Sequence, residues 1–165
     1  MELENQAAKQ AYIQLMSDAL ARKIQVLDQL QNLTEQQERV ITTEPFDEAL
    51  FLQTISIKEE HIKVLAQLDS GFEKLYTSVK EELVTGKSKY ETSIINMQEQ
   101  IKKITDLSVK LQALEKRNKA KMETMLIFKR KNIKSARVSN QTATNYYKTM
   151  SKQHENQSFF YDKKK

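Results

Sequence analysis

The stretch IINMQEQIKKITDLSVKLQAL, residues 94–114, has an apolar residue at every third or fourth position. The repeat runs through Ile94, Met97, Ile101, Ile104, Leu107, Leu111 and Leu114. This spacing places all seven side chains on one side of an α-helix. Neither glycine nor proline interrupts the stretch. It therefore predicts a long amphipathic helix with one narrow apolar stripe, which needs neighbouring helices to bury it.

Two further segments with the same pattern lie upstream. They predict helices over about residues 4–40 and 45–85 from their three-to-four-residue apolar spacing, and the opening stretch belongs to a third helix over 88–128. The predicted apolar stripe of the second helix consists of Leu50, Ile57, Val64, Leu68, Phe72, Leu75, Val79 and Leu83.

Two breaks separate the three helices. Proline fits the first turn of a helix but not its interior, so the second helix is predicted to start at Pro45, capped by Thr43 or Glu44. Gly86 is predicted to end that helix in a left-handed conformation. Ser88-Lys89-Tyr90-Glu91 matches the Ser-x-x-Glu capping box, which predicts that the third helix starts at 88–89.

The composition indicates an all-α protein. The chain has only two glycines and one proline in 165 residues, too few for the turns of a sheet-rich fold. We expect an elongated antiparallel three-helix coiled-coil bundle with a long third helix and a partly uncovered or flexible C-terminal segment. Residues 1–128 would form the bundle. Residues 129–165 would form a basic helical extension and an aromatic-containing tail.

The sequence carries no recognisable catalytic motif. It has no cysteine, and its two histidines, His61 and His154, lack partners at metal-ligand spacing. We expect no enzyme activity, no metal and no cofactor. The start of the chain lacks the layout of a signal peptide, and no apolar run approaches the roughly 20 residues of a membrane span. The expected location is the cytoplasm, without membrane insertion.

The charge is unevenly distributed. Residues 1–114 carry 13 Lys/Arg and 18 Asp/Glu, whereas residues 115–165 carry 14 Lys/Arg and 4 Asp/Glu. A basic segment can bind nucleic acid or another anionic surface through its charge. No nucleic-acid recognition motif accompanies it, so we expect a solvated helix surface and no nucleic-acid partner.

The apolar residues of the C-terminal third are a stronger indication of a partner. They exceed what two shorter helices would cover, and methionine adapts well to irregular partner surfaces. The candidate partner-binding residues are Met122, Met125, Leu126, Phe128, Ile133, Tyr146, Tyr147, Met150, Phe159, Phe160 and Tyr161. Burial of the Met122–Phe128 group in the bundle core is the alternative. The aromatic tail, SFFYDKKK, would either fold back on the bundle or lie against a partner.

The chain resembles bacterial flagellar export chaperones of the FlgN type. The resemblance rests on a helical hairpin followed by ITDLSVKLQALEKRNKAKMETML (residues 104–126), then ATNYYKTM and SFFYDKKK. The FliT-type chaperones are the near alternative. The resemblance implies a helical cytoplasmic protein that binds the disordered terminal segments of hook-associated (hook-filament junction) proteins. Such a protein prevents their premature assembly and delivers them to gate or ATPase components of the export apparatus. It places cargo binding in the C-terminal part, here Met122 to Met150.

Two other functions stay open at this point. One is the basic nucleic-acid or anionic-surface binder described above. The other is a structural coiled coil that oligomerises through its third helix. A third helix left partly uncovered would also allow a homodimer.

Overall fold

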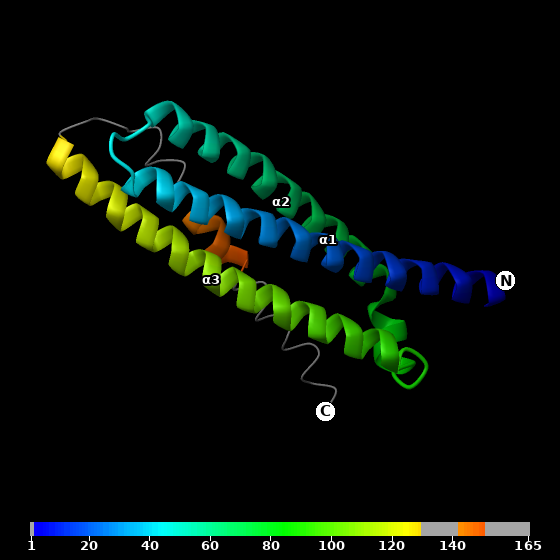
Figure 1. Cartoon of the computed structure of the whole chain (residues 1–165). Coiled ribbons are helices and arrows are strands. Elements are labelled where there is room, and N and C mark those ends of the chain that lie inside the picture. Colours follow the sequence, from blue (N-terminus) through cyan, green and yellow to red (C-terminus); the bar gives the residue numbers. More distant parts are fainter. Residues whose placement is uncertain (1, 130–141, 151–165) are drawn as a thin grey trace.

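The computed structural model describes residues 2–129 and 142–150 and confirms the all-α bundle. Three long helices follow one another in the chain: α1 (Glu2–Thr42), α2 (Glu48–Thr85) and α3 (Glu91–Lys129). A short helix over residues 142–150, the C-terminal helix, completes the described part. Figure 1 shows this helix lying alongside the middle of the bundle and not continuing the line of α3.

Helix α1 is the centre of the packing. It packs along both α2 and α3, whereas α2 and α3 make very few close contacts with each other. Contacts such as Gln37–Thr54 and Lys9–Glu82 make α1 and α2 antiparallel. The contacts Ser17–Gln100 and Thr34–Glu115 run in the same order, so α1 and α3 are parallel. Helices α2 and α3 thus lie along different sides of α1, and the space between α2 and α3 is bordered by α1.

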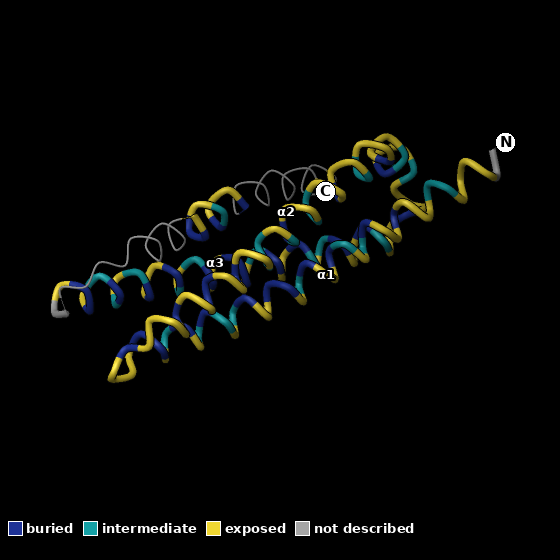
Figure 2. The backbone as a smooth tube through the Cα atoms, turned by 90° about the horizontal axis from the view of Figure 1, so that it is seen from above, coloured by how far each residue is buried: buried dark blue, intermediate teal, exposed yellow. Residues whose placement is uncertain are grey.

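The core consists of two apolar clusters. The larger one extends along most of the bundle and draws residues from all three long helices and from the C-terminal helix. The smaller one lies where α1 ends, α2 begins and α3 ends. Its members are Val40, Ile41, Phe46, Phe51, Ile55, Met122, Met125 and Leu126. Figure 2 shows the resulting pattern of buried and exposed residues along each helix.

The predicted start of the second helix is wrong. Helix α2 begins at Glu48, and Asp47, in extended conformation, is its N-cap. The Asp47 carboxylate accepts a hydrogen bond from the Leu50 backbone N–H at 3.0 Å. A short aspartate side chain satisfies a free N–H at a helix start better than glutamate does. Pro45 lies in the preceding loop, after a cis peptide bond.

The second connection also differs from the prediction. Gly86 ends α2, but its φ of −103° is not left-handed. Its N–H donates to the Glu82 carbonyl at 2.7 Å, and residues 86–90 form turns. Helix α3 begins at Glu91, directly after Tyr90, whose carbonyl accepts from the Ile94 N–H at 2.9 Å and whose side chain is buried in the larger core cluster.

The predicted apolar stripe is right for the C-terminal half of α2 and wrong at its start. Phe72, Val79 and Leu83 are buried as expected. In the first turns, Leu50 and Ile57 are more than one-third exposed, while Phe51 and Ile55 are buried. The sequence LFLQTISI offers apolar residues on more than one side of a helix, so periodicity alone does not select the buried side.

Candidate functional site

The C-terminal helix lies beside both α2 and α3, whose backbones approach each other at very few places. Ala143, Tyr147 and Met150 are buried in the larger core cluster. Their spacing of four and three residues places them on one side of the helix. Asn145, Lys148 and Thr149 are exposed. The helix over residues 142–150 is therefore amphipathic, and its apolar side is buried in the larger core cluster.

Polar contacts tie the C-terminal helix to both neighbours. The Tyr146 hydroxyl donates to Asp69 Oδ2 of α2 at 3.1 Å, and the Ser108 hydroxyl of α3 points at the Met150 sulfur at 3.8 Å. Asp69 also forms an ion pair with Lys23 of α1 at 2.5 Å. One carboxylate thus joins three helices. We call the side of the bundle that receives the C-terminal helix, marked by Asp69, Ser108 and Glu115, the docking face.

Burial dominates the electrostatics around Asp69. It raises the pKa of Tyr146 far above the usual tyrosine range, and the Asp69 charge raises it further. Burial also lowers the pKa of Lys23, while the ion pair with Asp69 opposes that shift. Tyr146 therefore stays a neutral hydrogen-bond donor, which matches its contact with an acceptor-only carboxylate.

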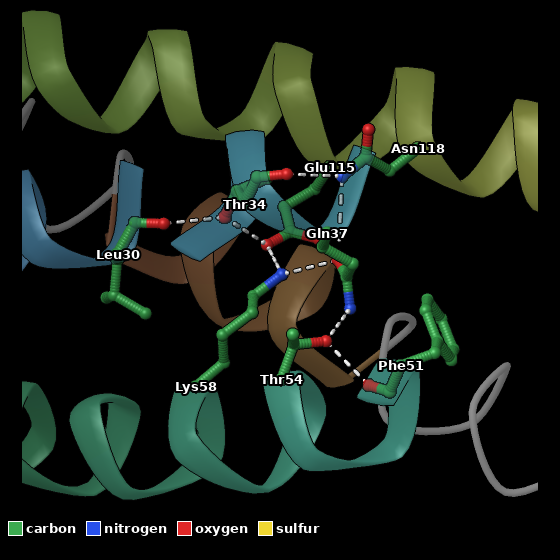
Figure 3. Close-up of polar contacts among 8 residues, drawn as sticks. All are labelled: Leu30, Thr34, Gln37, Phe51, Thr54, Lys58, Glu115 and Asn118. Carbon is green, nitrogen blue, oxygen red and sulfur yellow. Dashed lines mark hydrogen bonds and ion pairs between the residues drawn. The ribbon is translucent and has the colours of Figure 1, made fainter. Parts of the chain in front are cut away.

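A buried polar cluster adjoins the docking face. At its centre Lys58 of α2 forms an ion pair with Glu115 of α3, and both side chains are almost completely buried. Lys58 also donates to Gln37 Oε1 at 3.1 Å, and Gln37 donates to Thr54 at 3.3 Å. Figure 3 shows these residues between the three long helices, with the C-terminal helix beside them. The cluster links α1, α2 and α3 through one network.

Helix α1 and helix α3 share a second part of this network. Asn118 Nδ2 donates to the Thr34 carbonyl at 2.9 Å, and Thr34 Oγ1 lies 3.3 Å from Glu115 Oε1. The Thr34 hydroxyl also donates to the Leu30 carbonyl at 2.7 Å. Burial lowers the pKa of Lys58, and the nearby Glu115 charge opposes this. The ion pair is thus held where water cannot support either charge.

Three buried polar atoms in this region have no hydrogen-bond partner among the described residues. They are Glu115 Oε2, Asn118 Oδ1 and the Tyr147 hydroxyl oxygen. Burial raises the pKa of Tyr147 well above the usual range, and the Glu115 charge raises it further. The tyrosine hydroxyl and the carboxylate are therefore near enough to interact electrostatically, yet they form no hydrogen bond. An unpaired buried polar group is costly, so each such atom needs an explanation.

The structure separates the predicted partner-binding residues. Met122, Met125 and Leu126 are buried in the smaller core cluster, which agrees with the alternative that this group belongs to the bundle core. Tyr147 and Met150 are buried and Tyr146 is half-buried at the docking face. These two groups do not form one surface. The Phe128 side chain, Ile133, Phe159, Phe160 and Tyr161 lie outside the described residues. That these residues bind a partner stays a prediction.

Sequence reasoning missed the buried charges, although a signal for them was present. Glu115 and Asn118 continue the stripe between Leu111 and Met122 in steps of four, three and four residues. Lys58 similarly follows Phe51 and Ile55, and Lys23 lies between Leu20 and Leu27. A charged residue at a core position of a helix predicts a buried pair, because an unpaired charge would not be tolerated there. The pairing itself requires the packing of the helices.

The described part of the chain contains no cluster of side chains suited to bind a metal ion. Within residues 2–129 and 142–150, no group of three or more His, Cys, Asp or Glu side chains is placed to hold a metal ion. His61 is half-buried, and its ring nitrogens contact the Ile57 carbonyl at 2.9 Å and Gln29 Oε1 at 3.2 Å. His154 lies outside the described residues. None of the described helices is long and apolar enough to cross a membrane.

No family model, no curated protein and no solved structure matches this chain. What the protein does has therefore to be inferred from its residues and from their arrangement.

Proposed function

We propose that this protein is a cytoplasmic flagellar export chaperone of the FlgN type. It binds the disordered terminal segments of hook-associated proteins, keeps them from assembling prematurely and delivers them to the export apparatus. The resemblance of residues 104–126, ATNYYKTM and SFFYDKKK to that family supports the proposal. The docking face supports it independently, through the chemistry that such a chaperone needs.

The observation that carries the proposal is the seating of the C-terminal helix. The amphipathic helix over residues 142–150 is buried along one side in the larger core cluster, and it contacts Asp69 of α2 and Ser108 of α3. A bundle that accepts one such helix presents the features of helix-in-groove recognition, with apolar anchors spaced along one side of the bound helix. Disordered segments that fold into amphipathic helices on binding are the partners that suit this mode.

The C-terminal helix would then act as a cover for the docking face. An uncovered apolar face is an aggregation hazard, so a chaperone without cargo benefits from a cover. Cargo would take the place of Ala143, Tyr147 and Met150, and Tyr146 would release Asp69. In this proposal the tyrosines belong to the cover, and cargo contacts the residues beneath them. The aromatic tail remains a candidate for further contacts with cargo.

The nucleic-acid alternative receives less support from the described residues. Arg117 and Lys121 of the basic segment both pair with Glu38, at 2.5 and 3.4 Å. Their charge is thereby partly neutralised by the protein itself. Exposed pairs of this kind contribute little to stability, but they reduce the positive charge available to phosphates.

A thiol cross-link across the docking face tests the proposal. The chain has no cysteine, so Ser108→Cys with Met150→Cys creates one unique pair at a site where the native side chains approach to 3.8 Å. Dibromobimane, a bifunctional thiol reagent of very short span, would join the two thiols and hold the C-terminal helix in place. The tagged chain is then used to capture proteins from an extract of a flagellated bacterium, with and without the cross-linker.

We expect the untreated double variant to capture hook-associated proteins and the cross-linked form to lose them. Each single-cysteine variant, treated in the same way, is the matched control and should keep its capture. If no form captures a hook-associated protein, the chaperone proposal is wrong. If capture survives cross-linking, the docking face is not the cargo site. Nucleic acid that is captured instead, and is lost at high salt, would favour the basic-surface alternative.

A further inference from the structure

We propose that the docking face selects its occupant by a neutral hydrogen-bond donor that reaches Glu115 Oε2. The preferred partner is an amphipathic helix with apolar residues at the spacing of Ala143, Tyr147 and Met150, and with one amide or hydroxyl donor on that same side. This inference rests on the proposed function, because it assumes that a helix from another protein binds the docking face. It adds the chemistry by which that helix is recognised.

The first observation is the unused acceptor. Glu115 is fully buried, and its Oε1 atom forms the ion pair with Lys58 and lies near the Thr34 hydroxyl. Its Oε2 atom has no hydrogen-bond partner among the described residues. A buried carboxylate normally accepts several hydrogen bonds, because each one replaces the water that it has lost. An occupant of the docking face that donates a hydrogen bond to Oε2 would therefore be favoured over one that does not.

The second observation is that the chain's own helix fits this site imperfectly. The Tyr147 hydroxyl is a donor, it is buried, and it too has no hydrogen-bond partner in the described part of the chain. The charge of Glu115 acts on it without a hydrogen bond between them. One donor of the C-terminal helix and one acceptor of the bundle are thus both buried and unpaired. Each such group weakens an association by roughly ten- to a hundredfold relative to a paired one.

The donor should be neutral because the site already has its cation. Lys58 balances the charge of Glu115 inside the bundle, and both side chains are almost completely buried. A second buried cation would lack a counter-charge, and a carboxylate would be repelled by Glu115. Amides and hydroxyls provide the proton for the hydrogen bond without adding charge. Glutamine, asparagine, serine and threonine are therefore preferred over lysine or glutamate.

Better pairing also explains how a partner could displace a tethered helix. A helix tethered in the same chain competes at an effective concentration of roughly millimolar. A partner at about micromolar concentration must then bind roughly a thousandfold more tightly to take its place. Pairing the free acceptor and removing the unpaired hydroxyl contribute roughly ten- to a hundredfold each. The C-terminal helix is thereby a cover that a well-matched partner can replace.

Matched synthetic peptides test this proposal on the full-length chain. Each labelled peptide carries the sequence of residues 142–150 between identical Ala/Glu/Lys helical flanks. Glutamine, leucine or lysine is placed in turn at the position of Ala143, Tyr146 or Tyr147. Fluorescence anisotropy measures the dissociation constant for the wild-type chain and for the variant with Lys58→Met and Glu115→Leu. Leucine is the size-matched control for glutamine.

At one position we expect the glutamine peptide to bind at least tenfold more tightly than its leucine counterpart, and the lysine peptide to bind more weakly than the glutamine peptide. The preference for glutamine should disappear in the double variant. Equal or tighter binding of the leucine peptides overturns the proposal, as does a glutamine preference that persists without Glu115. The absence of any binding up to millimolar peptide overturns it as well.

The outcome is separable from the chaperone proposal. A glutamine preference with no capture of hook-associated proteins would leave the recognition chemistry standing and refute the flagellar function. If the cross-link blocks capture of hook-associated proteins and no glutamine preference is found, the flagellar function stands and the recognition chemistry is refuted.

Discussion

Replacing the members of the Lys58–Glu115 ion pair singly and together gives the sharpest test of the structure. Both side chains are almost completely buried, and they join α2 to α3, two helices whose backbones approach each other at very few places. Lys58→Met leaves a buried carboxylate without its cation, and Glu115→Leu leaves a buried ammonium group. Breaking a buried pair in this way costs about 3–5 kcal/mol of unfolding free energy. For a chain of this size that lowers Tm by roughly 6–20 °C.

The double variant should behave differently from the sum of the two single variants. Methionine and leucine fill similar volumes and require no hydrogen bonds, so replacing both members of a buried pair is often neutral or stabilising. The neighbours keep other contacts, since Thr34 donates to the Leu30 carbonyl and Gln37 donates to Thr54. We expect the double variant to unfold within about 1 kcal/mol of the wild type, or above it, which gives a large coupling energy.

Urea unfolding, followed by circular dichroism, measures the four free energies of this cycle. Single variants that each cost less than about 1 kcal/mol would refute the burial of the pair, as would a double variant that costs the sum of both. The pH dependence gives a second check. Burial lowers the pKa of Lys58 below 10.5, and loss of Glu115 lowers it further. The folded Glu115→Leu chain then binds fewer protons than the unfolded chain, so its stability should rise as pH increases towards 10.5.

Three further predictions concern the C-terminal helix. Tyr147→Phe removes an unpaired buried hydroxyl, so we expect the free energy of unfolding to rise by about 1 kcal/mol, and a lower Tm would show that the hydroxyl is hydrogen-bonded in solution. Asp69→Asn weakens the contacts to Lys23 and Tyr146, so amide hydrogen exchange in residues 142–150 should become faster. The control Glu60→Gln, which removes an exposed pair with Lys63, should leave that exchange unchanged. The raised pKa values of Tyr146 and Tyr147 keep both side chains protonated in the folded chain. The free energy of unfolding should therefore fall above about pH 10, where the tyrosines of the unfolded chain ionise. This loss should be smaller in the variant with both tyrosines changed to Phe.

Local chemistry explains which parts of the fold were predictable. The three helices and their two breaks follow from uninterrupted apolar spacing, few glycines and a single proline. The exact helix starts depended on finer contacts. Asp47 rather than Glu44 caps α2, since its carboxylate accepts from the Leu50 N–H, and the Tyr90 carbonyl accepts from the Ile94 N–H at the start of α3. Such choices are settled by a single contact and have little effect on the periodicity.

The candidate site was predictable only in outline. The sequence singled out Tyr146, Tyr147 and Met150 as apolar residues without an obvious place in a three-helix core. It could not show that they cover the space between α2 and α3, because that contact joins residues distant in the chain. The methionines of α3 looked equally available for binding, yet Met122 and Met125 are buried in the smaller core cluster.

The sequence by itself determined that this chain is helical, where its helices break and which residues repeat along each stripe. These properties depend on residues three or four positions apart, so a short stretch of sequence is enough to determine them. Only the tertiary structure decided that α1 lies between α2 and α3, that Lys58 meets Glu115, and that residues 142–150 return to the bundle. Each of these depends on which stripes face each other. An apolar stripe shows which side of a helix must be buried. It does not show which helix will cover that side, because the hydrophobic effect is not directional.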